Sequence, residues 1–288
     1  PDVDSLPRLK RLIFMLLVSL LCWILIQSQS PVAVKPLFVD LSAVNEDFGE
    51  PNSQDFLSLL SSDANRIRRA LTKIRQHWHP AFIVMMLEMI RLYSDQIRLD
   101  AIVKTLHEQT DQRYGHEYPR WLQYAWQQDY QPPKFYSEFK GLYYGKIDPR
   151  FSSHFESGNK ATIRLDEVCW GGVSRDRIPV IKQPEFVSAK EAQFLNAEDI
   201  VFGVTFAGVS KAYPRAVVGH HEIVRDRIAN KEIHCVYCIL TESTIVYESE
   251  IGDQEFEFAT SGFVFRSNKL MFDRKTESLW SAMRGEPV

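Results

Sequence analysis

The 288-residue chain is long enough for one large domain or two ordinary domains, each with its own hydrophobic core. Its formal net charge is −3, so no excess of basic residues supports nucleic-acid binding, and we exclude that class of partner. Hydrophobic residues make up 45% and charged residues 25%, which excludes a disordered chain, and four cysteines are too few for a fold held by disulfides.

The first predicted element is an uncharged apolar run, Leu12 to Ile26, that follows a basic stretch at residues 8–11. This order is typical of a signal peptide or a signal anchor. The run is at the long end for a signal peptide and shorter than the ~20 residues that span a bilayer as a helix. We favour an uncleaved membrane anchor over residues 1–30, with a cleaved signal peptide and a buried core helix as the alternatives.

An anchor also predicts the location of the rest of the chain. Basic residues stay on the cytoplasmic side, so everything after Ser30 should be periplasmic or extracellular, with the membrane itself as a partner. The chain begins at Pro1 without a methionine and stops at Val288 just after a region rich in motifs, so we expect a fragment of a longer protein.

The next two segments are a predicted linker and a predicted helical domain. Residues 31–53 contain three prolines and little periodicity, which predicts the linker. Over residues 54–131 apolar side chains recur at i, i+3, i+4 and i+7, which predicts a small stack of helices similar to HEAT-like solenoids. Such a stack either docks membrane-protein partners or only supports the next domain, and both interpretations stay open.

From about residue 161 the pattern changes to strands. Short segments rich in valine, isoleucine, tyrosine and phenylalanine alternate with turn residues, and paired strands are predicted around Ala207–Gly208 and Thr241–Glu242. The predicted fold class is therefore α+β, with a membrane anchor, a small all-helical stack and a mostly antiparallel β domain over residues 139–288.

Two cysteines with C-x-x-C spacing, Cys235 and Cys238, lie in one of these predicted strands. Residues three apart on a strand point to opposite faces, so the pair is not expected to act as a redox couple. A single thiol remains as the candidate, either as a nucleophile or as a metal ligand.

The segment "HHEIVRD" supplies the groups that would work with this thiol. His221 is the candidate base or second metal ligand, and Glu222 can orient it or join it. We therefore name Cys238, His221 and Glu222 as catalytic candidates. Cys238 and His221 are also candidate ligands of a transition metal, with copper, zinc and iron as the options.

Further polar residues lie in short turns and strand ends, where they can shape a ligand pocket. Tyrosine and arginine two apart share one face of an extended strand, as do the arginine and asparagine of "RSN". The predicted ligand-binding residues are Asp166, Trp170, Tyr213, Arg215, Ser261, Arg266 and Asn268.

Several unusual motifs occur in order in the second half of the chain: "LDEVCWGGV", "AYPR", "HHEIVRD", "VYCILTEST" and "TSGFVFRSNKLMFDRKTESLWSAMRGEPV". Together they resemble domain-of-unknown-function family 3179, whose bacterial and archaeal members often follow a signal or anchor segment. The resemblance covers about Phe139 to Val288. Family members continue past "GEPV" with a tryptophan-rich stretch, so this copy is expected to be truncated.

The resemblance also implies which residues of this chain differ from the family's motifs. His221 and Glu222 match a Trp-His-Glu pattern, and His220 stands in the place of the aromatic residue. Cys238 matches the first cysteine of a Tyr-Cys-x-Leu-Cys-Gly-Thr pattern, and Thr241 stands in the place of the second. The family comparison therefore leaves this protein with one motif thiol.

Two functions remain open from the sequence. The first is a membrane-anchored extracytoplasmic protein whose β domain holds a polar Cys/His site for a ligand or metal, with enzymatic capacity. The second is a non-catalytic accessory or scaffold subunit of a membrane protein complex.

Overall fold

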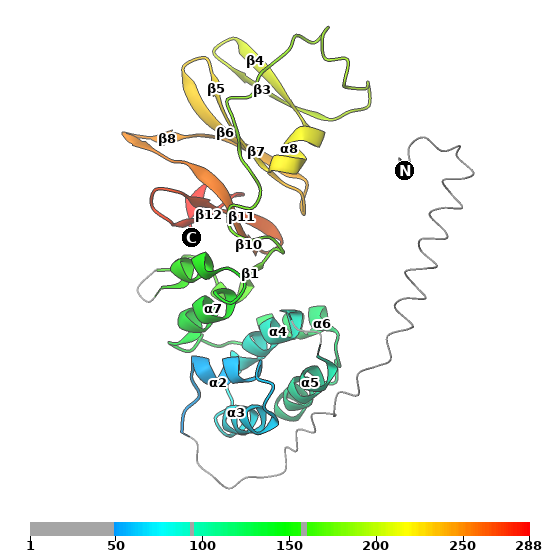
Figure 1. The fold of residues 1–288 in the computed structure, drawn as a ribbon, viewed down its shortest axis with the longest axis vertical. Coiled ribbons are helices and arrows are strands. Elements are labelled where there is room, and N and C mark those ends of the chain that lie inside the picture. Colours follow the sequence, from blue (N-terminus) through cyan, green and yellow to red (C-terminus); the bar gives the residue numbers. More distant parts are fainter. Residues whose placement is uncertain (1–48, 93–94, 157–159) are drawn as a thin grey trace, which may run out of the picture. The chain divides into compact units, whose positions relative to one another are not determined.

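The computed structural model describes residues 49–92, 95–156 and 160–288, which all belong to one compact unit (Figure 1). The predicted signal anchor and most of the predicted linker lie outside these residues. None of the helices that the structure describes is long and apolar enough to cross a membrane.

The periodic segments after the linker form helices. Asn52, Asp63 and Asp95 each precede a helix, and their side chains accept hydrogen bonds from N–H groups of the first turn. The most apolar helix is buried along most of its length, with Met85, Met86 and Leu87 fully shielded. The α-helices of this region are α2 (Ser53–Ser58), α3 (Ala64–Gln76), α4 (Phe82–Leu92), α5 (Gln96–Thr110), α6 (Tyr118–Gln127) and α7 (Tyr136–Tyr144).

Two short 3₁₀-helices, η2 (Pro149–Phe155) and η3 (Leu165–Glu167), lead from the helices to the first sheet. The segment around Leu165 was predicted to be extended, but it forms η3 and only three residues of strand follow. The first sheet has five strands in the order β1-β10-β11-β12-β13, and all its pairings are antiparallel. These strands are β1 (Val168–Trp170), β10 (Phe258–Phe265), β11 (Asn268–Asp273), β12 (Leu279–Ser281) and β13 (Glu286–Pro287).

The second sheet has four strands in the order β2-β5-β6-β7, and only its β2–β5 pairing is parallel. Its strands are β2 (Ile181–Lys182), β5 (Ile223–Ile228), β6 (Lys231–Cys238) and β7 (Ser243–Glu248). Two hairpins complete the β-rich part: β3 (Val201–Phe206) with β4 (Val209–Pro214), and β8 (Glu250–Ile251) with β9 (Gln254–Glu255).

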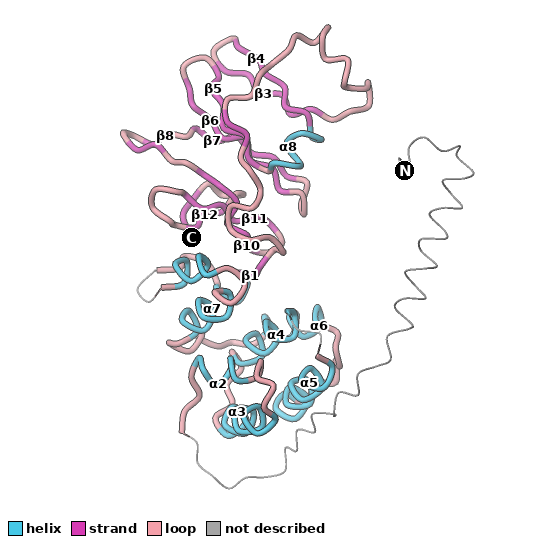
Figure 2. The backbone as a smooth tube through the Cα atoms, in the orientation of Figure 1, coloured by secondary structure: helices cyan, strands magenta, loops and turns pink. Residues whose placement is uncertain are grey.

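The α+β class is confirmed, and Figure 2 shows the helices followed by the strands. The strand pairings confirm that the sheets are mostly antiparallel. The predicted strand pairs form as β3–β4 and β6–β7. One local prediction was wrong: the strand that contains Tyr213 ends at Pro214, and helix α8 (Arg215–His221) follows at once. Pro214 fixes this boundary because its φ suits the residue before a first helical turn.

A buried lysine joins the helices to the first sheet. Lys140 of α7 is fully buried, and its Nζ atom donates to Glu88 Oε1 at 2.7 Å and to the Val168 carbonyl at 2.8 Å. The Tyr136 hydroxyl donates to the same carboxylate at 2.8 Å. Helices α4 and α7 and strand β1 are therefore held to one another by a single buried polar cluster.

Candidate functional site

The thiol of Cys238 lies at the end of β6, on the face of the second sheet that looks toward the first sheet. Cys235 lies on the other face, in a cluster with Tyr213 and Tyr237, whereas Val236 packs against residues of β10 and β11. The two cysteines thus point to opposite faces, as the alternation of a strand predicts. Burial raises the pKa of the Cys235 thiol to about 11, so Cys235 is an inert core residue.

Cys238 lines a cavity of about 260 Å³ between the two sheets. Its Sγ atom lies 3.9 Å from the carbonyl oxygen of Ser267 in the β10–β11 turn. Strands β10 and β11, the end of α8 and the loop after β1 form the other walls. The polar side chains in the lining are Glu222, Cys238, Thr260 and Lys269, and the lining glycines are Gly171, Gly219 and Gly262.

Lys269 and Glu222 form a buried ion pair inside this cavity. Lys269 Nζ lies 2.5 Å from Glu222 Oε2, and the two side chains are 5% and 13% exposed. Burial lowers the pKa of Lys269, although the charges of Glu222 and Cys238 oppose that shift. The ammonium group is thus easier to deprotonate than a lysine in water.

The position of Glu222 follows from the end of helix α8. Glu222 is the C-cap residue in the left-handed conformation (φ 59°), and its N–H donates to the Val218 carbonyl at 2.6 Å. Its own carbonyl accepts the Tyr237 N–H at 2.8 Å, which fixes the chain beside β6. The carboxylate therefore turns toward β10, where the Thr260 hydroxyl donates to it at 3.5 Å.

A glycine bulge in β10 brings the loop after β1 onto the cavity. The β10–β11 register shifts between Thr260 and Val264, and Gly262 within this bulge has a φ of +89°. A Cβ atom there would lie 2.5 Å from the Val173 carbonyl oxygen. Only glycine allows this close approach, which places Gly171 and Val173 in the cavity wall.

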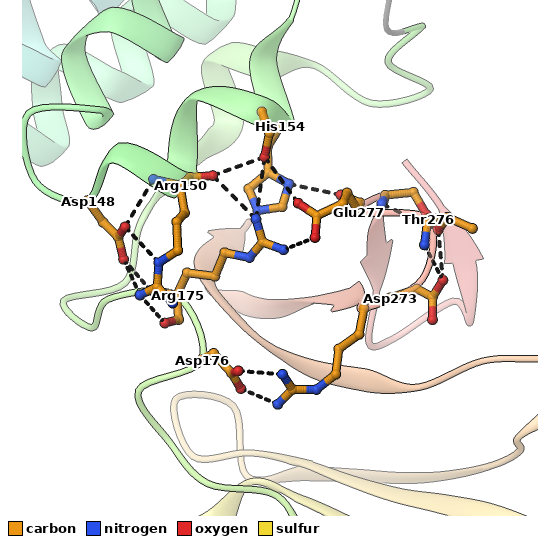
Figure 3. Close-up of polar contacts among 11 residues, drawn as sticks. Asp148, Arg150, His154, Arg175, Asp176, Asp273, Thr276 and Glu277 are labelled. Carbon is orange, nitrogen blue, oxygen red and sulfur yellow. Dashed lines mark hydrogen bonds and ion pairs between the residues drawn. The ribbon is translucent and has the colours of Figure 1, made fainter.

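Ion pairs hold the far end of the same loop (Figure 3). Arg175 pairs with Glu277 at 2.5 Å, and Asp176 pairs with both terminal nitrogens of Arg274. Asp273 orders the turn that carries these partners, since its carboxylate accepts the Thr276 N–H at 2.9 Å. These contacts lie outside the cavity, and they fix the loop that forms one of its walls.

His221 does not share the cavity with Cys238. Its Nδ1 atom is 2.8 Å from the Pro179 carbonyl oxygen, and the ring is not part of the cavity lining. His220 is exposed and contacts the Ala216 carbonyl at 2.6 Å. Within the ranges that the structure describes, no group of three or more metal-ligating side chains occurs.

Two predicted ligand-binding residues belong to a second cavity. Asp166 accepts hydrogen bonds from the Tyr130 hydroxyl and from Arg164, both at 2.7 Å, and Arg266 forms a two-armed ion pair with Glu167. Both Asp166 and Arg266 line this second cavity, which is next to the first.

The other predicted ligand-binding residues make local contacts. The Tyr213 hydroxyl donates to Asp226 at 2.8 Å, the Trp170 indole donates to the Val173 carbonyl at 2.7 Å, and the Ser261 hydroxyl donates to the Leu270 carbonyl at 2.6 Å. Arg215 lies 3.8 Å from Glu242 on the surface. The Asn268 amide donates to Thr241 and Ser243, which ties two turns together.

Lys269 is the site residue that the sequence analysis missed. It stands inside "NKLMFD", where three apolar residues follow it, and a charge in such a strand must find a partner when both faces of the strand are buried. The need of a buried charge for a partner was therefore the signal in the sequence that points to Lys269. It does not identify Glu222 as the partner, because the two are 47 positions apart.

In the comparisons with known proteins, one family model matches the part of the chain that contains this site. The family model "Protein of unknown function (DUF3179)" matches residues 175–288, which confirms the resemblance in the C-terminal part of the chain. The matched stretch contains all four polar side chains of the Cys238 cavity. No curated protein and no solved structure matches the chain. The likeness of the helices to HEAT repeats therefore stays a prediction.

Proposed function

We propose that the β-rich part of the chain binds a small organic ligand in the Cys238 cavity, with the thiol as its reactive group. The observation that carries this proposal is that a thiol shares one small cavity with the buried Lys269–Glu222 pair. The proposal places the protein outside the cytoplasm, attached to the membrane through residues 1–30.

The chemistry of the cavity supports an activated thiol. A buried ion pair rarely adds stability over apolar side chains of the same volume, so its presence beside a nucleophile favours a functional role. The Glu222 carboxylate accepts the proton of the Cys238 thiol. The transfer is either direct or passes through Lys269. The resulting thiolate can add to a carbonyl carbon of the ligand, where the C–S bond forms as the C=O π bond opens and its electron pair moves to the oxygen. The Lys269 ammonium can stabilise this negative charge. Lys269 and Glu222 thus take the place that the sequence analysis gave to His221.

The same charges favour an organic ligand over a metal ion. An ammonium group in the lining repels a second cation, and Glu222 already has Lys269 as its partner. The copper, zinc or iron site predicted from Cys238 and His221 has no support from this arrangement of donors. A ligand with a carbonyl or carboxylate group matches the cavity better.

Thiol labelling tests this function. We expect methyl methanethiosulfonate to modify Cys238 in the folded full-length chain and to leave Cys235 intact, as measured by mass spectrometry of the separate peptides. Lys269→Gln should slow labelling of Cys238 by at least about 10-fold, because it removes the positive charge that stabilises the thiolate. The matched control is Lys211→Gln, which removes another lysine paired to a buried aspartate, Asp226. Equal labelling of the two cysteines, or an equal effect of the two lysine variants, would contradict the proposal.

A non-catalytic accessory role is the second candidate, and an exposed apolar surface favours it. Val187, Phe194 and Ile200 are 55%, 65% and 50% exposed in the loop before β3, beside an apolar groove of about 800 Å³. Exposed apolar patches often mark contacts with other proteins. This role predicts that Phe194→Asp abolishes co-purification with a membrane protein and that Cys238→Ser does not. Equal co-purification of both variants would argue against this surface.

A further inference from the structure

A second cavity, of about 480 Å³, lies where α4 and α6 meet β1 and the β10–β11 turn. Neither the family match nor the proposed thiol function assigns it a role. Three polar groups converge in it from separate elements: Arg91 from the last turn of α4, Tyr118 from the start of α6 and Cys169 from β1.

The charges around this cavity leave one basic group without an acidic partner. Three carboxylates line it, and each is neutralised: Glu88 by Lys140, Asp166 by Arg164, and Glu167 by Arg266. Arg91 forms no ion pair with any carboxylate of the described residues, and its polar neighbours are Cys169 and Tyr118. The cavity therefore has one uncompensated positive charge.

The neighbours of Arg91 suit a bound anion. Burial raises the pKa of Tyr118 to about 12, so its hydroxyl stays protonated and can donate a hydrogen bond. The same two helices also give the cavity an apolar wall, which includes Val84, Leu122 and Trp126. Ligand cavities of this size are usually apolar, with a few polar groups that fix the orientation of the ligand.

We propose that this cavity binds a monoanionic small molecule with one carboxylate on an apolar body. The Arg91 guanidinium would hold the carboxylate with two parallel hydrogen bonds, and the Tyr118 hydroxyl would donate a third. The apolar wall would cover the body of the ligand. A single uncompensated charge fits one carboxylate better than a doubly charged phosphate.

Protection of Cys169 provides a direct test, because this thiol is partly exposed and lies beside Arg91. The probes are hexanoate and hexanamide, which share one apolar body and differ in charge. We expect hexanoate to slow the alkylation of Cys169 by iodoacetamide several-fold in the full-length chain, and hexanamide to need at least about 10-fold higher concentration for the same effect. Calorimetric titration of both probes gives their affinities independently of the thiol chemistry.

Variants of Arg91 identify the group responsible. Arg91→Gln should abolish the preference for hexanoate, and Arg91→Lys should keep part of it, because lysine retains the charge and loses the planar fork. Arg69→Gln, on the exposed surface of α3, is the matched control and should change nothing. Equal binding of the two probes, binding of neither, or an unchanged preference in Arg91→Gln would overturn the proposal. If Arg91→Gln fails to fold, the comparison of hexanoate with hexanamide on the natural chain still tests the proposal.

Discussion

The Nζ atom of Lys269 lies 2.5 Å from Oε2 of Glu222, and solvent reaches little of either side chain. Strand β11 carries the lysine, and the residue that ends helix α8 carries the carboxylate. Their pairing therefore depends on the packing of the second sheet against the first. Loss of one partner leaves an uncompensated charge in the cavity.

We expect Lys269→Met to destabilise the protein by about 3–5 kcal/mol, the usual cost of removing one partner of a buried pair. The double variant Lys269→Met/Glu222→Leu should recover much of that loss, because it removes both charges. The measurement is the free energy of unfolding from urea titration. Lys275→Met, in a half-exposed pair with Glu255, is the control and should cost less than about 1 kcal/mol. A double variant no more stable than the single one would contradict this account.

Two glycines separate the effect of backbone strain from the effect of close contact. Gly172 and Gly262 both have positive φ, but a Cβ atom meets nothing at Gly172 and meets the Val173 carbonyl at 2.5 Å at Gly262. We expect Gly172→Ala to cost about 1–2 kcal/mol from strain alone. Gly262→Ala should cost at least about 2 kcal/mol more, because the loop must also move. Thermal unfolding of the two variants gives the comparison, and equal costs would show that the contact is easily relieved.

Two buried histidines should make stability depend on pH. Burial, together with Arg175 for His154 and Arg225 for His234, lowers the pKa of each to about 4. In the unfolded chain their pKa is about 6.5, so between these values the unfolded state binds protons that the folded state does not. Stability should therefore be complete above pH 6.5 and fall as the pH drops toward 4, by on the order of 1 kcal/mol per pH unit for each histidine.

Urea titrations at pH 7, 6 and 5 measure this slope while most carboxylates stay ionised. His234→Asn should reduce the slope, and the exposed His220→Asn should leave it unchanged. A slope that is the same in both variants would assign the pH dependence to other groups.

The buried lysine of α7 offers a prediction about the helical part. Lys140→Met removes the only described basic partner of the Glu88 carboxylate and one donor to the Val168 carbonyl. We expect a loss of about 3–5 kcal/mol. Lys104→Met, which breaks an exposed pair with Glu108 on α5, should change stability by less than about 1 kcal/mol. A small effect of Lys140→Met would show that water reaches the carboxylate.

Local sequence patterns predicted most elements of the fold, because periodicity and turn residues act over a few positions. The hairpin around Ala207–Gly208 and the strand that contains both Cys235 and Cys238 are examples. Helix α8 was missed since "AYPRAVV" has the β-branched composition of a strand. Pro214 and the packing of Val218 in the core cluster decide its conformation instead.

The candidate site was predictable only in part, for a similar reason. Cys238 and Glu222 were named together, and the structure places both in one cavity. His221 precedes Glu222 directly, yet the left-handed C-cap turns the two side chains apart. Lys269 joins this site through its ion pair with Glu222, 47 positions away, which is a long-range contact that no local motif encodes.

The aromatic ring of Phe263 packs against residues that precede the stretch matched by the family model. It lies on β10, and the rings of Tyr144, Phe151 and Phe155 lie 4.7–5.2 Å from it. Those three residues precede the first residue that the family model matches. A protein cut at that sequence boundary would lose these three rings, expose Phe263 to water and should aggregate. The compact unit of this architecture starts upstream of the matched stretch and includes α7.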